Sequence, residues 1–284
     1  AMEHAGRTGG LPFVGVGWYR TEFDVPQFQA GKRATILFDG AMSHANVYIN
    51  GQKVGYWPYG YNSFHFDITK YLKPGEKNTL AVRLENLPES SRWYPGAGLY
   101  RNVHLIITED AYIPVWGTYI TTPSVNEKFA KVNVRTKVVL PEGADPAKYS
   151  VETSVWNPNK QKLTAVRTSL AQMKYNNNQA EQEFVIQAPS LWSPEMPALY
   201  SAETRLYEGD KLKDIYTTPF GIRSIEIIPD KGFFLNGKRT VFKGVCNHHD
   251  LGPLGAAVND AAIRRQIRIL KDMGCNAIRT SHNM

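Results

Sequence analysis

The segments FKGVCNHHD (residues 242–250) and NAIRTSHN (residues 276–283) decide how the C-terminal part of this chain folds. Each begins with a short apolar run and ends in polar residues, which is typical of a buried strand whose carboxyl end meets solvent. Between them, Asn259 fits a helix N-cap and Gly274 a C-cap. One apolar helical stripe consists of Ile263, Ile267 and Leu270. Strand, helix and strand in this order predict the opening of a parallel (β/α) barrel.

A complete barrel of this kind needs about 200 to 250 residues. Residues 223–284 number only 62. The sequence therefore predicts an incomplete TIM barrel start in residues 223–284, introduced by a hairpin at Asn236-Gly237.

Residues 1–110 show a series of short aromatic and β-branched segments that predict strands. Asn50-Gly51 is a strong type I′ hairpin signal, because both central residues of that turn need positive φ. Pro74-Gly75 marks another turn. No amphipathic helix interrupts the series, so we expect an eight-stranded jelly roll or a close relative. The expected strands are residues 18–25, 34–40, 45–55, 63–69, 78–86 and 100–108.

Residues 111–222 continue as strands with clean alternation. Apolar side chains at Val132, Val134 and Val138 fall on one side, and polar ones lie between them. The strand count and turn spacing suit an immunoglobulin-like β-sandwich. Residues 174–182 are polar and are expected to form a hairpin tip. The predicted fold is therefore mainly β, a jelly-roll sandwich followed by an immunoglobulin-like sandwich and the barrel start.

Composition limits the classes of partner. The 284 residues carry a net charge of +7, and residues 223–284 hold ten Lys or Arg against five Asp or Glu. This local excess includes Arg264, Arg265, Arg268 and Lys271 on one predicted helix, which could form a phosphate-binding stripe. A solvated helix face is the preferred interpretation, so we expect no nucleic-acid partner. No apolar run reaches the roughly 18 to 20 residues of a membrane span, so no membrane partner is expected.

The two cysteines, Cys246 and Cys275, predict neither a zinc site nor a disulfide framework. They fall at opposite ends of neighbouring parallel strands, which places them beyond the roughly 7 Å Cα separation that a disulfide allows. We expect both to be buried small hydrophobes, and we expect no metal and no cofactor.

The motifs resemble those of family 2 glycoside hydrolases of the β-galactosidase kind along nearly the whole chain. RWYPGAGLYRNVHL (residues 92–105) looks like that family's sugar-binding jelly-roll motif. LWSPEMPALY (residues 191–200) and FGIRSIEI (residues 220–227) are similar to the end of its immunoglobulin-like domain. Residues 242–250 and 276–283 match its barrel start with the N-x-x-R-[ST]-[ST]-H signature. The same signature opens β-galactosidases, β-glucuronidases and β-mannosidases.

The resemblance implies a substrate-binding group at the strand ends. His248 and His282 would contact the sugar, Asp250 would accept from a hydroxyl, and Arg279 would brace a catalytic carboxylate. Two further residues, Asn283 and Arg92, are assigned to the same group. Side chains of these types suit a pyranose, whose hydroxyls both donate and accept hydrogen bonds. A satisfied polar role without sugar contact stays open for each histidine.

Aromatic side chains in the jelly roll leave a second alternative open. Arg92 and Trp93 could shape the substrate pocket, or their Gly-rich loop could pack on its own sheet. Some family members carry an acidic residue near Arg92, which puts sugar contact there in doubt. Sugar stacking would also suit Trp57, Tyr59 and Tyr61, although core or interface positions are preferred.

A retaining glycosidase needs two carboxylates about 5 to 5.5 Å apart. In the family that the motifs resemble, both come from later barrel strands, with the acid/base in an Asn-Glu pair. No such pair follows Asn126-Glu127 in this sequence. We therefore expect no catalytic residue in this chain, and we expect the acid/base and nucleophile glutamates to lie beyond Met284.

The preferred function is thus the accessory, substrate-shaping region of a hydrolase of β-galactosides, inactive alone and with an oligo- or monosaccharide β-glycoside as partner. The alternatives are action on β-glucuronides or β-mannosides, a free-standing carbohydrate-binding module, and an interaction scaffold.

The predicted barrel start leaves apolar faces without their usual partners. We therefore expect self-association through residues 241–284, since exposed sheet edges recruit other edges. Localisation is not readable from the sequence; a bacterial periplasmic or secreted protein would fit if an upstream signal had been removed.

Overall fold

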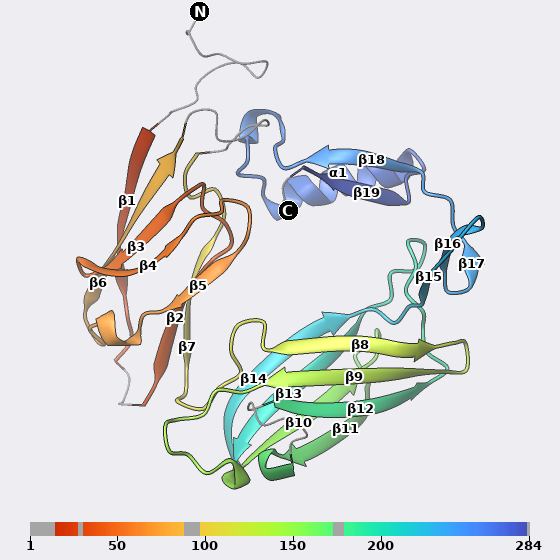
Figure 1. Cartoon of the computed structure of the whole chain (residues 1–284), viewed down its shortest axis with the longest axis horizontal. Coiled ribbons are helices and arrows are strands. Elements are labelled where there is room, and N and C mark those ends of the chain that lie inside the picture. The colour runs from red at the N-terminus through yellow and green to blue at the C-terminus, as the bar shows by residue number, and fades with distance from the viewer. Residues whose placement is uncertain (1–14, 28–30, 88–96, 173–178, 283–284) are drawn as a thin grey trace, which may run out of the picture. The chain divides into compact units, whose positions relative to one another are not determined.

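The computed structural model describes residues 15–27, 31–87, 97–172 and 179–282 (Figure 1). Two compact units divide the chain. The first comprises residues 1–107 together with 242–284, and the second comprises residues 108–241.

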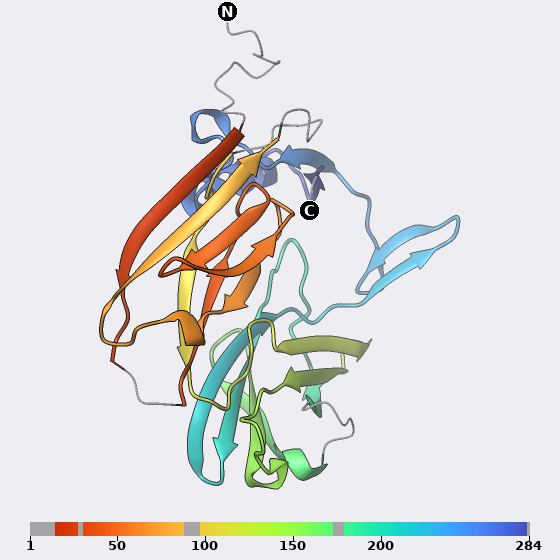
Figure 2. The ribbon, with the colours of Figure 1, turned by 60° about the vertical axis from the view of Figure 1, so that its left-hand side comes forward.

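Two antiparallel sheets form the jelly roll of the first unit (Figures 1 and 2). One sheet has the order β1 (Gly15–Asp24), β6 (Lys77–Asn86), β3 (Ala45–Ile49) and β4 (Gln52–Trp57). The other has the order β5 (Phe64–Asp67), β2 (Arg33–Phe38) and β7 (Val103–Thr108), and a 3-10 turn spans Thr69–Tyr71. The described residues thus give seven of the eight strands expected. Alternate apolar side chains fill the space between the sheets, among them Phe38, Val47, Ile49, Ile68 and Val82.

Hairpin and turn chemistry fixes the register of the first sheet. Asn50 and Gly51 have φ of 50° and 80°, as a type I′ turn requires. Asn50 also donates through Nδ2 to Asn78 Oδ1 at 2.8 Å. Asn78 is fully buried and its amide donates to the carbonyls of Lys73 and Glu76, both at 2.9 Å. This asparagine therefore ties the turn before β6 to the β3–β4 hairpin.

The second unit is a sandwich of the immunoglobulin-like kind. Its first sheet has the order β12 (Gln179–Gln187), β9 (Phe129–Lys137) and β8 (Thr118–Val125). Its second sheet has the order β11 (Lys162–Ser169), β10 (Tyr149–Trp156), β13 (Tyr200–Glu208) and β14 (Lys211–Phe220), with 3-10 turns at Pro146–Lys148 and Leu170–Gln172. The predicted face of β9 is confirmed, because Val132, Val134 and Val138 are all buried.

One sequence prediction in this unit is wrong. The polar tip expected over residues 174–182 does not extend to Gln182, which lies inside β12 and is buried. Its amide donates to the carbonyls of Val151 and Val166 at 3.1 and 2.8 Å. A polar residue can occupy the interior here because the facing sheet offers it backbone acceptors from β10 and β11. Residues 174–178 of the expected tip lie outside the described residues.

A small three-stranded antiparallel sheet follows within the second unit, with the order β15 (Ile225–Ile228), β16 (Gly232–Leu235) and β17 (Lys238–Arg239). Positive φ values of 52° at Asn236 and 74° at Gly237 confirm the predicted turn.

The barrel start belongs to the first unit and consists of β18 (Gly244–His248), a 3-10 turn (Gly252–Leu254), α1 (Asp260–Asp272) and β19 (Ala277–Ser281). The two strands pair in parallel, as predicted. Asn259 caps the helix by accepting from the Ala262 backbone N–H at 2.9 Å. Gly274, with φ of 87°, follows its C-terminal end. Among the described residues no helix has the length and apolarity to cross a membrane.

The burial expected for the cysteines is wrong for Cys246, which is exposed, while Cys275 is intermediate. Both are free thiols. The cause is the sparse cover of this segment: α1 buries none of its own residues, and two strands with one helix do not enclose a strand face.

Candidate functional site

The parallel register of β18 and β19 brings two of the predicted site residues together. His248 lies opposite Ser281, so His282 follows directly at the same edge of the sheet. The imidazole rings of His248 and His282 lie edge to face, with centroids 5.1 Å apart and an interplanar angle of 82°. A neutral imidazole offers one donor and one acceptor nitrogen. The pair can therefore bind neighbouring hydroxyl groups of one ligand.

Arg279 lies in β19, two residues before Ser281, and hydrogen bonds to residues of β18 and β19 hold its side chain in place. Its Nη1 donates to Ser281 Oγ at 3.3 Å and to Cys246 Sγ at 3.6 Å. Ser281 is buried, although the neighbouring strand surface is open. The hydrogen bond from Arg279 lowers the pKa of the Cys246 thiol, and a second one with Ser281 acts in the same direction. Arg279 thus points along the strand surface with its guanidinium anchored.

Loops of the jelly roll supply the opposite wall of the site. The Tyr100 hydroxyl donates to the Gly60 carbonyl at 2.8 Å. Arg101 donates through Nη1 to the Asp39 carbonyl at 3.3 Å, and its guanidinium carbon lies 5.0 Å from the centroid of the Tyr100 ring. The Asp39 carboxylate in turn contacts His104 Nε2 at 2.9 Å. Burial raises the pKa of Tyr100, and the positive charge of Arg101 opposes that shift.

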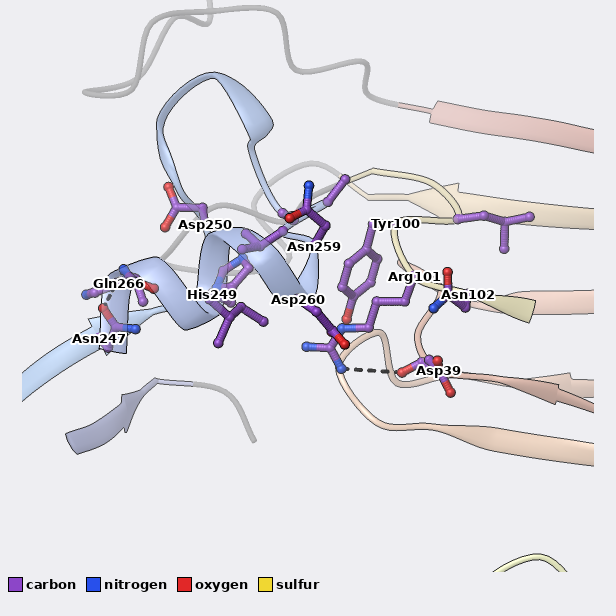
Figure 3. Close-up of a pocket in the computed structure, with 16 residues that line it drawn as sticks. Asp39, Tyr100, Arg101, Asn102, Asn247, His249, Asp250, Asn259, Asp260 and Gln266 are labelled. Atoms are coloured by element: carbon purple, nitrogen blue, oxygen red, sulfur yellow. Dashed lines mark hydrogen bonds between the residues drawn. The ribbon is translucent and has the colours of Figure 1, made fainter. Parts of the chain in front are cut away.

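Between these loops and the barrel start lies a pocket of about 560 Å³. Figure 3 shows residues of β18, α1 and the loop between them on one side, with Tyr100, Arg101 and Asp39 on the other. Asn247 is fixed in the wall because its Oδ1 accepts from Gln266 Nε2 at 3.0 Å. Polar side chains that converge on such a volume are typical of a small-molecule site.

A second pocket, of about 450 Å³, adjoins the first and shares Arg101, Asn247, His248 and His249 with it. Tyr61 lines it from the jelly roll, and its ring meets the His249 ring edge to face with centroids 5.1 Å apart. Ser281 and Thr280 line it from β19. His248, His249 and the jelly-roll side chains Tyr61 and Tyr100 therefore border one continuous region, whereas His282 lines neither pocket.

The predicted site residues differ in where they lie relative to the two pockets. Asp250 lines the larger pocket beside His248, whereas Arg279 lines neither pocket. Of the jelly-roll aromatics, Trp57 packs against the core with its ring stacked on Phe64 at 5.6 Å.

Three of the predicted positions lie outside the described residues, namely Arg92, Trp93 and Asn283. The expectation that the catalytic glutamates follow Met284 is not tested by the structure and stays a prediction.

Sequence reasoning assigned no site role to His249, Tyr100 or Arg101. The doubled histidine after β18 was a usable signal, since successive residues beyond a strand end point in different directions. No sequence signal singled out Tyr100 and Arg101, because they lie in the loop between β6 and β7, where the sequence has no hydrophobic periodicity. Within the described residues, no cluster of three or more His, Cys, Asp or Glu side chains is placed to hold a metal ion.

The chain consists of a jelly roll, an immunoglobulin-like sandwich and the first strands of a barrel, with polar groups at the ends of the barrel strands. This is the domain order of multidomain glycoside hydrolases. Three models of the glycosyl hydrolase family 2 match the chain: the sugar binding domain over residues 12–109, the central domain over 112–223 and the TIM barrel domain over 226–283. The chain belongs to glycosyl hydrolase family 2.

Relatives of named activity cover nearly all of the chain. It is 44% identical to a β-galactosidase of Bacteroides ovatus over 100% of the chain and 33% of that protein. It is 39% identical to a putative β-glucuronidase of Formosa agariphila over 98% of the chain and 26% of that protein. A crystal structure of a family 2 member from Bacteroides cellulosilyticus superposes with a TM-score of 0.87 at 37% identity, covering 95% of this chain and 35% of that one. The chain thus spans about a third or less of these relatives.

Proposed function

We propose that this chain is the N-terminal, substrate-shaping region of a retaining glycoside hydrolase that acts on β-galactosides. The observation that carries the proposal is the parallel strand pair that sets the imidazole rings of His248 and His282 side by side, with centroids 5.1 Å apart. His248 also lines both pockets that the jelly-roll loops border. The β-galactosidase of Bacteroides ovatus supports the choice of sugar.

In this mechanism the chain binds and orients the sugar, and the two catalytic carboxylates come from barrel strands that follow Met284. His248, His282 and Asp250 would contact ring hydroxyls, and Arg279 would brace a carboxylate. Interactions that strengthen as the sugar distorts toward the transition state raise kcat, and so the chain contributes to catalysis without donating a proton. Asn283 and Arg92 keep their predicted roles as substrate contacts.

The prediction of three domains, residues 1–110, 111–222 and 223–284, is supported by the residues that the three family models match.

The experiment compares this chain with the same chain continued through a complete barrel, on aryl β-galactosides, β-glucuronides and β-mannosides. The complete form should hydrolyse the galactoside fastest, and the chain alone should give no turnover. Preference for the glucuronide would select the alternative that the Formosa relative favours. Turnover by the chain alone, abolished by substituting one of its own Asp or Glu residues, would refute the proposal.

We also propose that two copies of the isolated chain associate through residues 241–284. Large apolar side chains are exposed there, among them Val241 and Phe242 at 59% each, Ile263 at 44% and Ile278 at 38%. Burial of such surface in a second copy contributes about 25 cal/mol per Å². Light scattering on the chain with and without residues 241–284 decides the question, and a monomer at high concentration would refute the proposal.

A further inference from the structure

Strand β1 forms the outer edge of its sheet, with β6 as its neighbour on one side (Figures 1 and 2). Among the described residues no strand pairs with its other side. The pairing of β1 with β6 runs from Gly15 to Asp24 without a register shift. By contrast, β4 at the opposite edge pairs with β3 through a shift between Val47 and Tyr48, and such bulges protect an edge from further pairing. The ten residues of β1 therefore offer a regular, open row of backbone N–H and C=O groups.

Large side chains of this edge strand remain in contact with solvent. Val16 is 40% exposed, Trp18 56% and Tyr19 41%. The strand contains neither lysine nor proline, the residues with which natural proteins often protect an open edge. Its solvent face instead carries charges of opposite sign, with Arg20 followed two residues later by Glu22, both exposed. A strand of this kind pairs best with one whose charges run in the reverse order.

An antiparallel copy of β1 provides that order. A two-fold axis perpendicular to the sheet keeps each residue on its own face, so solvent-face residues oppose solvent-face residues of the second copy. With the axis at Thr21, Arg20 falls opposite Glu22 of the second copy and Tyr19 falls opposite its Phe23. Opposite charges, aromatic rings and threonines are cross-strand pairs that stabilise an antiparallel sheet. In this register the strand is complementary to itself.

Neighbouring registers are less favourable. An axis at Arg20 sets two guanidinium groups directly opposite each other, and an axis at Glu22 does the same for two carboxylates. Like charges in opposite positions destabilise a sheet. An axis at Tyr19 brings Arg20 opposite Trp18 but leaves Glu22 opposite the apolar Val16. The charge pattern therefore selects the axis at Thr21.

We propose that two copies of the chain associate through their β1 edges, antiparallel and with the two-fold axis at Thr21, so that two four-stranded sheets become one continuous sheet. Glu22 also lies 3.9 Å from Lys77 Nζ, but both side chains are mostly exposed, so this ion pair exchanges at little cost. The occupant is a second copy because β1 itself supplies the complementary charges and rings. None of its residues lines the pockets beside β18, so this association is independent of the hydrolase function and of association through residues 241–284.

Disulfide trapping in the whole chain tests the pairing, with Cys246→Ser and Cys275→Ser to remove its two cysteines. Directly opposite residues of antiparallel strands have Cα atoms about 4.5–5.5 Å apart, within the range of a disulfide. Thr21→Cys should therefore give a covalent dimer on mild oxidation. Tyr19→Cys is the matched control and should give none, because the two positions would be separated by four residues, about 13 Å along the strand.

Thermal unfolding shows whether each cysteine variant is folded. Gly17→Cys replaces Tyr19→Cys as the control if the latter is unfolded, because a Cβ at Gly17 would meet only an ordinary contact, 3.8 Å from the Tyr19 ring. It should likewise give no covalent dimer.

Sedimentation velocity of the whole chain with its native cysteines tests the charge pairing. Arg20→Glu should raise the apparent dissociation constant at least fivefold, because it places like charges opposite each other. Arg20→Glu combined with Glu22→Arg should restore the parental value, because the pair is then reversed. Lys53→Glu makes the same change of charge on β4 and should leave the value unchanged. Association through residues 241–284 is common to all these variants, so differences among them report on β1.

Three results would overturn the proposal. The first is a folded Thr21→Cys chain that forms no covalent dimer, and the second is equal trapping of the control cysteine. The third is a double charge variant that associates as weakly as Arg20→Glu alone.

Discussion

Replacement of Tyr100 by phenylalanine removes one hydroxyl from the wall of the larger pocket. That hydroxyl donates to the carbonyl of Gly60, a buried residue next to Tyr61. A hydrogen bond contributes about 0.5–1.5 kcal/mol net, and a buried acceptor left unpaired costs about 1–3 kcal/mol. We expect Tyr100→Phe to destabilise the first unit by about 2 kcal/mol, because the aromatic ring stays and only the hydrogen bond is lost.

Urea unfolding of the chain measures this change. Tyr59→Phe is the control, because Tyr59 is 39% exposed and its ring lies 5.5 Å from that of Tyr61. The pH profile adds a second readout. Burial raises the folded-state pKa of Tyr100, so its contribution to stability is fully present below the unfolded value of about 10 and is lost as the pH rises through the folded value. Tyr100→Phe should remove that alkaline loss. Equal stabilities of Tyr100→Phe and Tyr59→Phe would refute the reasoning.

Two further predictions concern local structure. Asn259→Ala should cost α1 about 1 kcal/mol through the lost N-cap bond to Ala262, seen as faster amide exchange in the first turn; unchanged exchange would contradict the cap. In the second unit, Lys213 Nζ lies 2.9 Å from Asp110 Oδ1, and the hydrogen bond from Lys213 lowers the pKa of that carboxyl. The stabilisation is present above the ordinary pKa of Asp110 and is lost as the pH falls through the lowered value. Lys213→Met should therefore flatten the acid limb of a stability–pH curve, and an unchanged acid limb would argue against this coupling.

Local chemistry made much of the fold predictable. Asn50-Gly51 and Asn236-Gly237 predict their turns because few other residues take positive φ, and Asn259 predicts its helix because its side chain satisfies a free backbone N–H. The burial of Gln182 was not predictable, because its partners at Val151 and Val166 come from strands that only the fold brings near.

The candidate site divides in the same way. His248 and His282 could be predicted because they follow two recognisable parallel strands. The jelly-roll wall could be predicted only in part. Tyr61 was one of the aromatic residues suited to sugar stacking, whereas Tyr100 and Arg101 lie in a loop whose approach to β18 depends on tertiary packing.

The measurement that tests the central claim most directly is kcat/KM for an aryl β-galactoside, with the chain continued through a complete barrel and carrying His282 or His282→Ala. We predict turnover by the parent and a loss of tenfold or more in His282→Ala, about 1.4 kcal/mol of transition-state stabilisation, with unchanged unfolding of the first unit. Parental kinetics in His282→Ala would contradict the account, because the histidine pair at the strand ends would then bind no substrate.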